Sequence, residues 1–155
     1  MENTQTNVNR TIRRKFERET AIKMLNELQN KIAGANLDAI CDDDLEITSN
    51  DFNDDLSMRR LLQAVQCGLV YWDDSENCMV QELINPLKSG DLTADKFYYK
   101  HKLSIAQIKE NNTTNQIELV MRLLSQITGR AIPLIGQLYG TDMEISMGCL
   151  SFFGK

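Results

Sequence analysis

Metal-binding side chains are scarce in this chain of 155 residues. His101 is the only histidine, so a histidine-rich metal site is excluded. The four cysteines, Cys41, Cys67, Cys78 and Cys149, are scattered and form no C-x-x-C pair. We expect them to be reduced thiols. The sequence therefore predicts no bound metal and no other cofactor.

Long apolar runs are also missing. No run approaches the roughly 20 residues that a membrane-spanning helix needs. The first ten residues, MENTQTNVNR, are polar and lack the apolar core of a secretory signal. We therefore expect no membrane contact and a cytoplasmic location.

The sequence motifs of common enzymes are not found. There is no G-x-S-x-G elbow, and no cysteine has a histidine that the sequence would place beside it. Gly154-Lys155 resembles the end of a phosphate-binding loop, but no Ser or Thr and no helix follow it. The chain is therefore expected not to be an enzyme.

Positive charge is concentrated at the start of the chain, although the whole chain carries −5. Up to residue 23 there are six basic and three acidic residues, a balance of 6 − 3 = +3. Arg13, Arg14 and Lys15 are therefore candidates for binding nucleic acid. The net negative charge argues against general nucleic-acid binding and favours a solvated helix face instead.

Negative charge is concentrated in residues 36–55, which contain eight acidic residues and no Lys or Arg. The basic N-terminal segment is one counterpart for these charges, and a cation is the alternative. Asp51, Asn53 and Asp55 match the start of a calcium loop, but Leu56 and Leu62 occupy the positions that need Gly and Glu. We interpret residues 36–56 as an exposed acidic connector.

The first half of the chain contains two helix patterns and one hairpin pattern. Apolar residues at helical spacing predict an amphipathic helix from Thr11 to about Gly34 and a second helix over residues 57–67. Residues 69–72 and 78–84 flank a polar turn and predict a β-hairpin, with Tyr71 and Trp72 as packing anchors. Asn85-Pro86 is expected to end its second strand.

A basic and aromatic cluster follows the hairpin. A turn is expected at residues 88–91, then a short helix from Thr93 through Tyr98. The cluster consists of Lys96, Tyr98, Tyr99, Lys100, His101 and Lys102. Such side chains can bind phosphates or stack on bases. The commoner alternative is a helix with half-buried tyrosines and lysines that extend along its surface.

Three helices are expected after residue 115. Apolar residues at spacings of three and four predict the first, which begins at Asn115 with Glu118 and ends at Gly129. Pro133 suits the first turn of a second, short helix. Thr141 with Glu144 begins the third, which is expected to run to Phe152 and Phe153. Met143 and Met147, four residues apart, are expected in the core.

The expected fold is mostly α with a small β-hairpin, in the α+β class. We divide the chain into an N-terminal amphipathic helix (residues 1–35), the acidic connector (36–56) and a third part (57–155). The third part combines a helix, the β-hairpin and a helical C-terminal module.

The region from about residue 69 to residue 155 resembles the C-terminal half of tail assembly chaperones from long-tailed bacteriophages. A leucine-rich helix that ends in TG, an L-x-x-x-D step and terminal paired aromatics carry this resemblance, on Leu119, Leu123, Leu124, Thr128, Gly129, Leu138, Asp142, Phe152, Phe153 and Gly154. A strand followed by P…GD-L adds Leu83, Pro86, Gly90, Asp91 and Leu92. Arg130 departs from the usual small apolar residue.

The resemblance implies a non-enzymatic role in the host cytoplasm. Such chaperones coat the tape measure protein and recruit tail tube subunits before polymerisation. Helix faces would then accept amphipathic client helices, through Ile117, Val120, Leu124, Leu134, Leu138, Leu150, Phe152 and Phe153. Self-association of the chain is a further expectation. The alternatives are a structural virion protein, of the head-tail or capsid accessory kind, and a small nucleic-acid-binding regulator that uses Arg13, Arg14 and Lys15.

Overall fold

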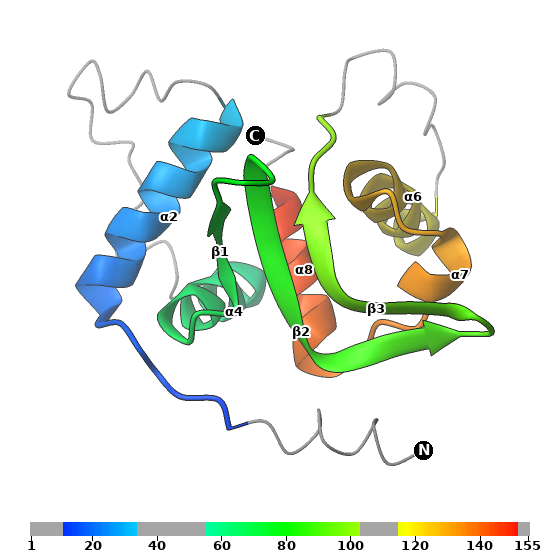
Figure 1. The fold of residues 1–155 in the computed structure, drawn as a ribbon, viewed down its shortest axis with the longest axis horizontal. Helices are drawn as coiled ribbons and strands as arrows, with labels where there is room; N and C mark the ends of the chain where they lie inside the picture. The colour runs from blue at the N-terminus through cyan, green and yellow to red at the C-terminus, as the bar shows by residue number, and fades with distance from the viewer. Residues whose placement is uncertain (1–10, 34–54, 103–114, 152–155) are drawn as a thin grey trace.

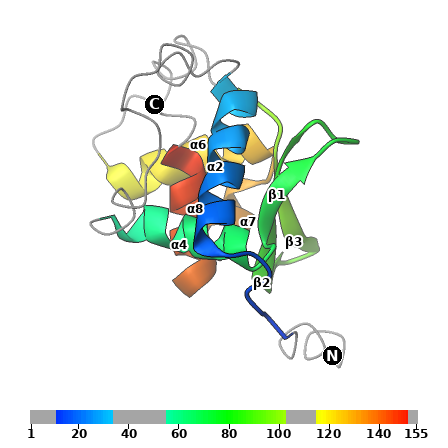
Figure 2. The ribbon, with the colours of Figure 1, turned by 90° about the vertical axis from the view of Figure 1, so that its left-hand side faces the viewer.

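A computed structural model of the chain describes residues 11–33, 55–102 and 115–151. In this part of the chain, five helices and a three-stranded antiparallel sheet form an α+β fold, as the sequence predicted (Figure 1). The elements are α2 (Arg18–Ala33), α4 (Leu56–Gln66), β1 (Val70–Asp73), β2 (Cys78–Ser89), β3 (Leu92–Tyr99), α6 (Gln116–Thr128), α7 (Ile132–Ile135) and α8 (Gly140–Ser151). The strand order is β1-β2-β3, and α4, α6 and α8 lie on one side of the sheet (Figure 2).

The sheet is larger than the predicted hairpin, because β2 does not end at Asn85-Pro86. Pro86 is exposed and lies where the pairing with β3 shifts register, between Glu82 and Leu87. An irregularity of this kind tolerates a residue without an N–H group. The strand therefore bends at Pro86 and continues to Ser89.

The predicted helix from Thr93 is wrong, because residues 92–99 form β3. A turn at Gly90 and Asp91, inside the expected turn region, places Leu92 opposite Ser89, and pairing with β2 extends to Tyr99 opposite Met79. Gly90 has φ 62, which suits a tight turn between two strands. Aromatic residues favour a paired strand, so sheet formation outweighs the helix-like start signal.

The first helix begins later than predicted, at Arg18 instead of Thr11. The backbone N–H groups of Lys15 and Phe16 both donate to the carbonyl oxygen of Gln66, at 2.6 and 3.1 Å. These bonds fix residues 11–17 as a non-helical segment against the end of α4. Gly34, the expected end of the helix, lies outside the described residues.

The predicted ends of the later helices agree with the structure. The Asn115 side chain accepts a hydrogen bond from the Glu118 N–H, and Gly129 ends α6 in the left-handed conformation with φ 73. Pro133 lies in the first turn of α7. Helix α8 begins one residue before Thr141 and is described as far as Ser151.

The end of the predicted acidic connector belongs to α4. Asp55 is the N-cap of that helix, and its carboxylate accepts hydrogen bonds from the N–H groups of Ser57 and Met58. Leu56 is the first helical residue. The other calcium-loop positions, Asp51 and Asn53, lie outside the described residues.

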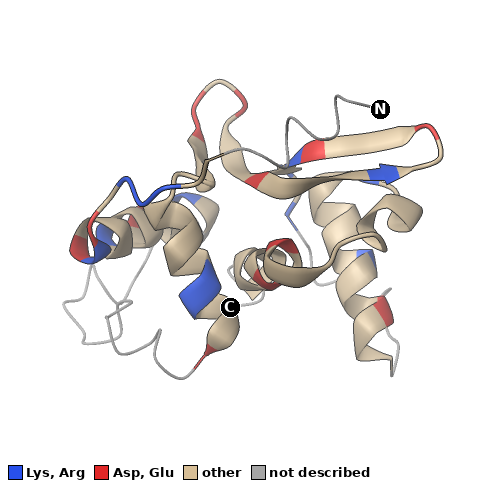
Figure 3. Cartoon of the chain, turned by 90° about the horizontal axis from the view of Figure 1, so that it is seen from below, with Lys and Arg blue, Asp and Glu red and all other residues tan. Residues whose placement is uncertain are grey.

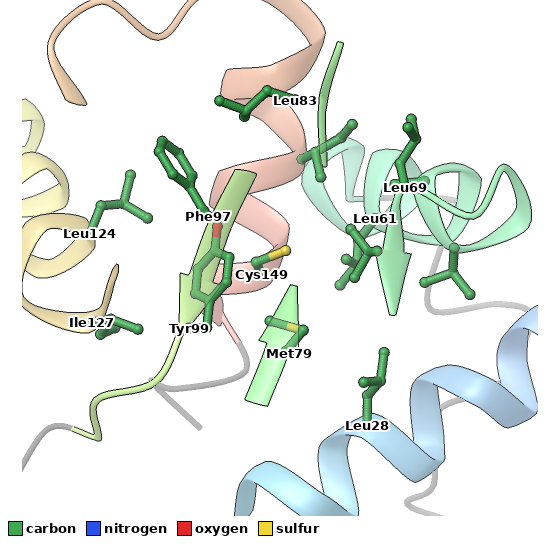
Figure 4. Packing of buried hydrophobic residues seen from close by; sticks show 14 of the residues in the cluster. Leu28, Leu61, Leu69, Met79, Leu83, Phe97, Tyr99, Leu124, Ile127 and Cys149 are labelled. Atoms are coloured by element: carbon green, nitrogen blue, oxygen red, sulfur yellow. The ribbon is translucent and has the colours of Figure 1, made fainter. Parts of the chain in front are cut away.

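One continuous hydrophobic core receives side chains from all these helices and strands (Figure 4). Its largest fully buried side chains include Phe97, Leu25 and Met79. Helix α8 crosses α4 closely at Gly148, where a Cβ atom would lie 2.5 Å from the Ser57 carbonyl oxygen and 2.8 Å from Leu61 Cβ. Glycine therefore permits this crossing. None of the described helices is long and apolar enough to cross a membrane.

Candidate functional site: an apolar groove between three helices

Helices α6, α7 and α8 enclose an open cavity of about 350 Å³, which we call the apolar groove. Such a volume falls at the lower end of the range of ligand pockets. All of its lining residues except Gln116 and Gly136 have apolar side chains. The lining consists of Gln116, Ile117, Val120, Met121, Leu124, Ile135, Gly136, Leu138, Met143 and Met147. The groove is therefore suited to an apolar segment.

The amphipathic pattern of α6 and the sharp chain reversal after it create the groove. Leu124 and Ile127 point from α6 into the core (Figure 4). One turn earlier on the same helix, Val120 and Met121 are only partly buried. Gly129 then turns the chain, and α7 returns alongside α6. The apolar face of α6 therefore remains partly uncovered toward the N-terminal end of the helix.

Hydrogen bonds fix this reversal. Ser125 Oγ donates to the Arg130 carbonyl oxygen at 2.6 Å, and Arg130 N–H donates to Thr128 Oγ1 at 3.3 Å. Arg130 Nη2 donates to the Lys96 carbonyl oxygen on β3 at 3.1 Å. Arg130 thus attaches the α6–α7 connection to the sheet.

Large apolar side chains at the rim of the groove face solvent. Ile117 is 75% exposed and Met143 is 45% exposed. Tyr139 and Ile132, which do not line the groove, are also exposed, at 59% and 44%. Single exposed apolar residues are ordinary on a protein surface, but a group of them beside a groove is typical of a binding site.

The groove carries no unpaired charge among the described residues. The only charged side chains of α6, Glu118 and Arg122, form an ion pair with each other. On α8, Glu144 pairs with Arg60 at 3.4 Å, and Asp142 is buried. In Figure 3 the helix at the lower right carries a blue and a red patch and is otherwise uncharged. Charge therefore contributes little to the choice of the segment that binds in the groove.

A buried hydrogen-bond network holds α8, one wall of the groove, on the sheet. Gln81 lies at its centre: Gln81 Oε1 accepts from Tyr99 Oη at 2.7 Å and from Ser146 Oγ at 2.9 Å. Gln81 Nε2 donates to the Asp142 carbonyl oxygen at 3.1 Å. These groups have partners in the interior, as buried polar groups require, so the network is structural.

The Asp142 side chain accepts hydrogen bonds from backbone N–H groups at the bend in β2. Its two carboxylate oxygens accept hydrogen bonds from the N–H groups of Ile84 and Asn85, both at 2.8 Å. The side chain is 1% exposed, and desolvation raises the pKa of its carboxyl group, although the two backbone hydrogen bonds oppose this rise. The aspartate of the L-x-x-x-D step thus acts as an acceptor for a strand irregularity.

The predicted protein-binding residues fall into three groups. Ile117, Val120, Leu124 and Leu138 line the apolar groove. Leu134 is buried in the core, and Leu150 is half-buried against it. Phe152 and Phe153 lie outside the described residues.

Sequence reasoning missed part of the groove. Met143 and Met147 were expected in the core, but both line the groove, and Met143 is 45% exposed. The other lining residues that were not predicted are Gln116, Met121, Ile135 and Gly136. A four-residue spacing of methionines identifies a helix face but does not tell which neighbour covers it.

The three candidate nucleic-acid-binding residues do not share a helix face. Arg13, Arg14 and Lys15 are exposed and lie in the non-helical segment before α2. Arg14 Nη2 lies 4.0 Å from a carboxylate oxygen of Glu17. The Lys15 side chain lies against Gly68. The structure therefore does not combine these charges into one helical surface.

Comparison with family models, curated proteins and solved structures gives no match for this chain. Within the described residues, no group of three His, Cys, Asp or Glu side chains is placed to hold a metal ion.

Proposed function

We propose that this protein is a non-enzymatic chaperone that holds an amphipathic helix of a client protein in the apolar groove. The observation that carries the proposal is an open groove of about 350 Å³ whose rim exposes Ile117 and Met143. Unbranched methionines adapt their shape to different apolar surfaces, which suits a holding function. A helix laid in a groove inserts its apolar side chains at helical spacing.

The resemblance of residues 69–155 to tail assembly chaperones supplies the identity of the client. We propose the tape measure protein of a long-tailed bacteriophage, held in the host cytoplasm before the tail tube assembles around it. Four predicted contact residues, Ile117, Val120, Leu124 and Leu138, line the same groove. This shared position supports the proposal, because a holding function needs contact residues on one accessible surface.

Co-expression with the tape measure protein tests the proposal. The wild-type chain should keep the client in the soluble fraction, whereas the double variant Ile117→Glu, Met143→Glu should not. Each side chain is exposed, so we expect both changes to leave the fold intact. Leu92→Glu is the matched control, because Leu92 is also 45% exposed but lies on β3, away from the groove.

Two results would contradict the proposal. If the double variant keeps the client soluble as well as Leu92→Glu does, the groove is not the binding site. If the protein is found at stoichiometric levels in purified virions, the structural alternative is favoured over the chaperone.

A further inference from the structure

A second cavity, of about 430 Å³, lies away from the apolar groove. It is bounded by the last turn of α2, the β1–β2 turn and the residues after β3, which meet along the upper edge of the molecule in Figure 1. We call it the lysine pocket. Its polar and aromatic lining includes Lys31, Trp72, Asp74, Asn77, Lys100 and Lys102.

The lysine pocket is positive in a negatively charged protein. Three lysines and one aspartate line it, a balance of 3 − 1 = +2, while the whole chain carries −5. Lys100 Nζ lies 2.8 Å from Glu76 Oε2, so the balance is still +1 when Glu76 is counted. Within the described residues, Lys31 and Lys102 form no ion pair. A cavity with excess positive charge concentrates anions.

An aromatic wall accompanies these charges. The Lys31 ammonium group lies 5.2 Å from the centre of the Trp72 ring. Trp72 is partly buried and packs against the core, as expected for a hairpin anchor, while it also lines the pocket. Lys31 in the last turn of α2 also interacts favourably with the helix dipole. The helix dipole explains the position of Lys31 at the end of α2. It does not explain why Lys102 lines the same cavity.

We propose that the lysine pocket binds a mononucleotide. Lysine ammonium groups act as point charges toward phosphate, and Lys31 and Lys102 line the pocket without an ion pair to any described residue. The volume of 430 Å³ lies within the range of small-molecule pockets and is larger than a phosphate ion requires. Trp72 offers the aromatic surface on which a base can pack. Three residues of the basic and aromatic cluster, Tyr99, Lys100 and Lys102, would line this binding site.

Trp72 provides the assay, because it is the only tryptophan in the chain. The full chain is titrated with AMP while Trp72 fluorescence is excited at the red edge of indole absorption, where the nucleotide does not absorb. We expect a saturable change. Inorganic phosphate and adenosine, each half of the ligand, should bind at least about tenfold more weakly, a difference of about 1.4 kcal/mol.

Variants separate the pocket from general charge effects. Lys31→Met with Lys102→Met should lower the affinity for AMP at least about tenfold, or 1.4 kcal/mol. Lys23→Met is the matched control, because Lys23 is an exposed lysine of α2 outside the pocket, and it should leave the affinity unchanged. Calorimetry repeats the comparison, since loss of Lys31 alters Trp72 fluorescence directly.

Several results would overturn the proposal. One is the lack of saturation at about 10 mM AMP, well above the ~1 mM Kd of weak binding. Equal affinity in the double lysine variant and in Lys23→Met would remove the pocket as the site. Equal binding of phosphate and AMP would reduce the site to an anion site. Tighter binding of a single-stranded oligonucleotide than of AMP would assign it to nucleic acid instead.

Discussion

The close crossing of α4 and α8 makes a quantitative prediction for Gly148→Ala. The new Cβ would lie 2.5 Å from the Ser57 carbonyl oxygen, whereas ordinary contact begins at 3.4 Å. The helices must therefore separate by up to 3.4 − 2.5 = 0.9 Å at this point. Because the obstacle is backbone, it cannot move aside as a flexible side chain would.

The expected cost follows from two opposing effects. Overpacking a core costs typically about 1–3 kcal/mol, and contact with backbone favours the upper end. Alanine is better than glycine in a helix by about 1 kcal/mol. The difference predicts that the free energy of unfolding falls by about 2 kcal/mol, which lowers Tm by about 4–8 °C in a protein of this size.

Urea and thermal unfolding, followed by circular dichroism, measure this change. Gly136→Ala is the matched control, because its Cβ would lie 3.2 Å from the flexible end of Met121. We expect its free energy of unfolding to stay within about 0.5 kcal/mol of wild type. If Gly148→Ala is as stable as the control, α4 and α8 do not pack as closely as described.

The other predictions concern buried polar and thiol groups. Asp142→Asn should lower the free energy of unfolding at neutral pH by about 1–3 kcal/mol, because an amide has only one oxygen to accept from the two β2 N–H groups; a variant as stable as wild type in urea would contradict this role. Burial raises the folded-state pKa of Asp142 above its ordinary value of 3.8. The protonated Asp142 carboxyl group should therefore contribute most to the free energy of unfolding below pH 3.8. This contribution should be lost as the pH rises through the higher folded-state pKa. Asp142→Asn removes this part of the pH profile, and unchanged profiles would refute the assignment. Burial also raises the pKa of Cys149 to about 12 and that of Cys78 above its ordinary value. In a variant with Cys41→Ser and Cys67→Ser, a thiol reagent at pH 8 should therefore label these two cysteines only after unfolding, and rapid labelling of the folded protein would contradict their burial.

Sequence patterns predicted helix ends better than strands. The end signals of α6, Asn115, Glu118 and Gly129, act through hydrogen bonds and backbone angles within a few residues, so they are visible locally. Strand β3 was missed because its partner, β2, decides its conformation across the hairpin. The late start of α2 depends on the Gln66 carbonyl oxygen, about fifty residues away in sequence.

The candidate site was only partly predictable for a related reason. The apolar stripe of α6 is periodic and indicated Ile117, Val120 and Leu124 as one helix face. Whether a position on that stripe is buried depends on where α7 and α8 lie. Leu134 is thus in the core and Met143 at the rim, although both are apolar residues on helices.

The central position of α8 affects the order in which this protein can fold during synthesis. Helix α8 packs against the sheet and against α4 (Figure 1), and its Ile145 and Cys149 are buried in the core. The ribosome adds 139 − 66 = 73 further residues after the end of α4 before it reaches the start of α8. At about 5–20 residues per second, this takes roughly 4–15 s. During that interval the nascent chain exposes the α4 and sheet surfaces that α8 later covers, so ribosome-bound chains that stop before residue 140 should be protease-sensitive.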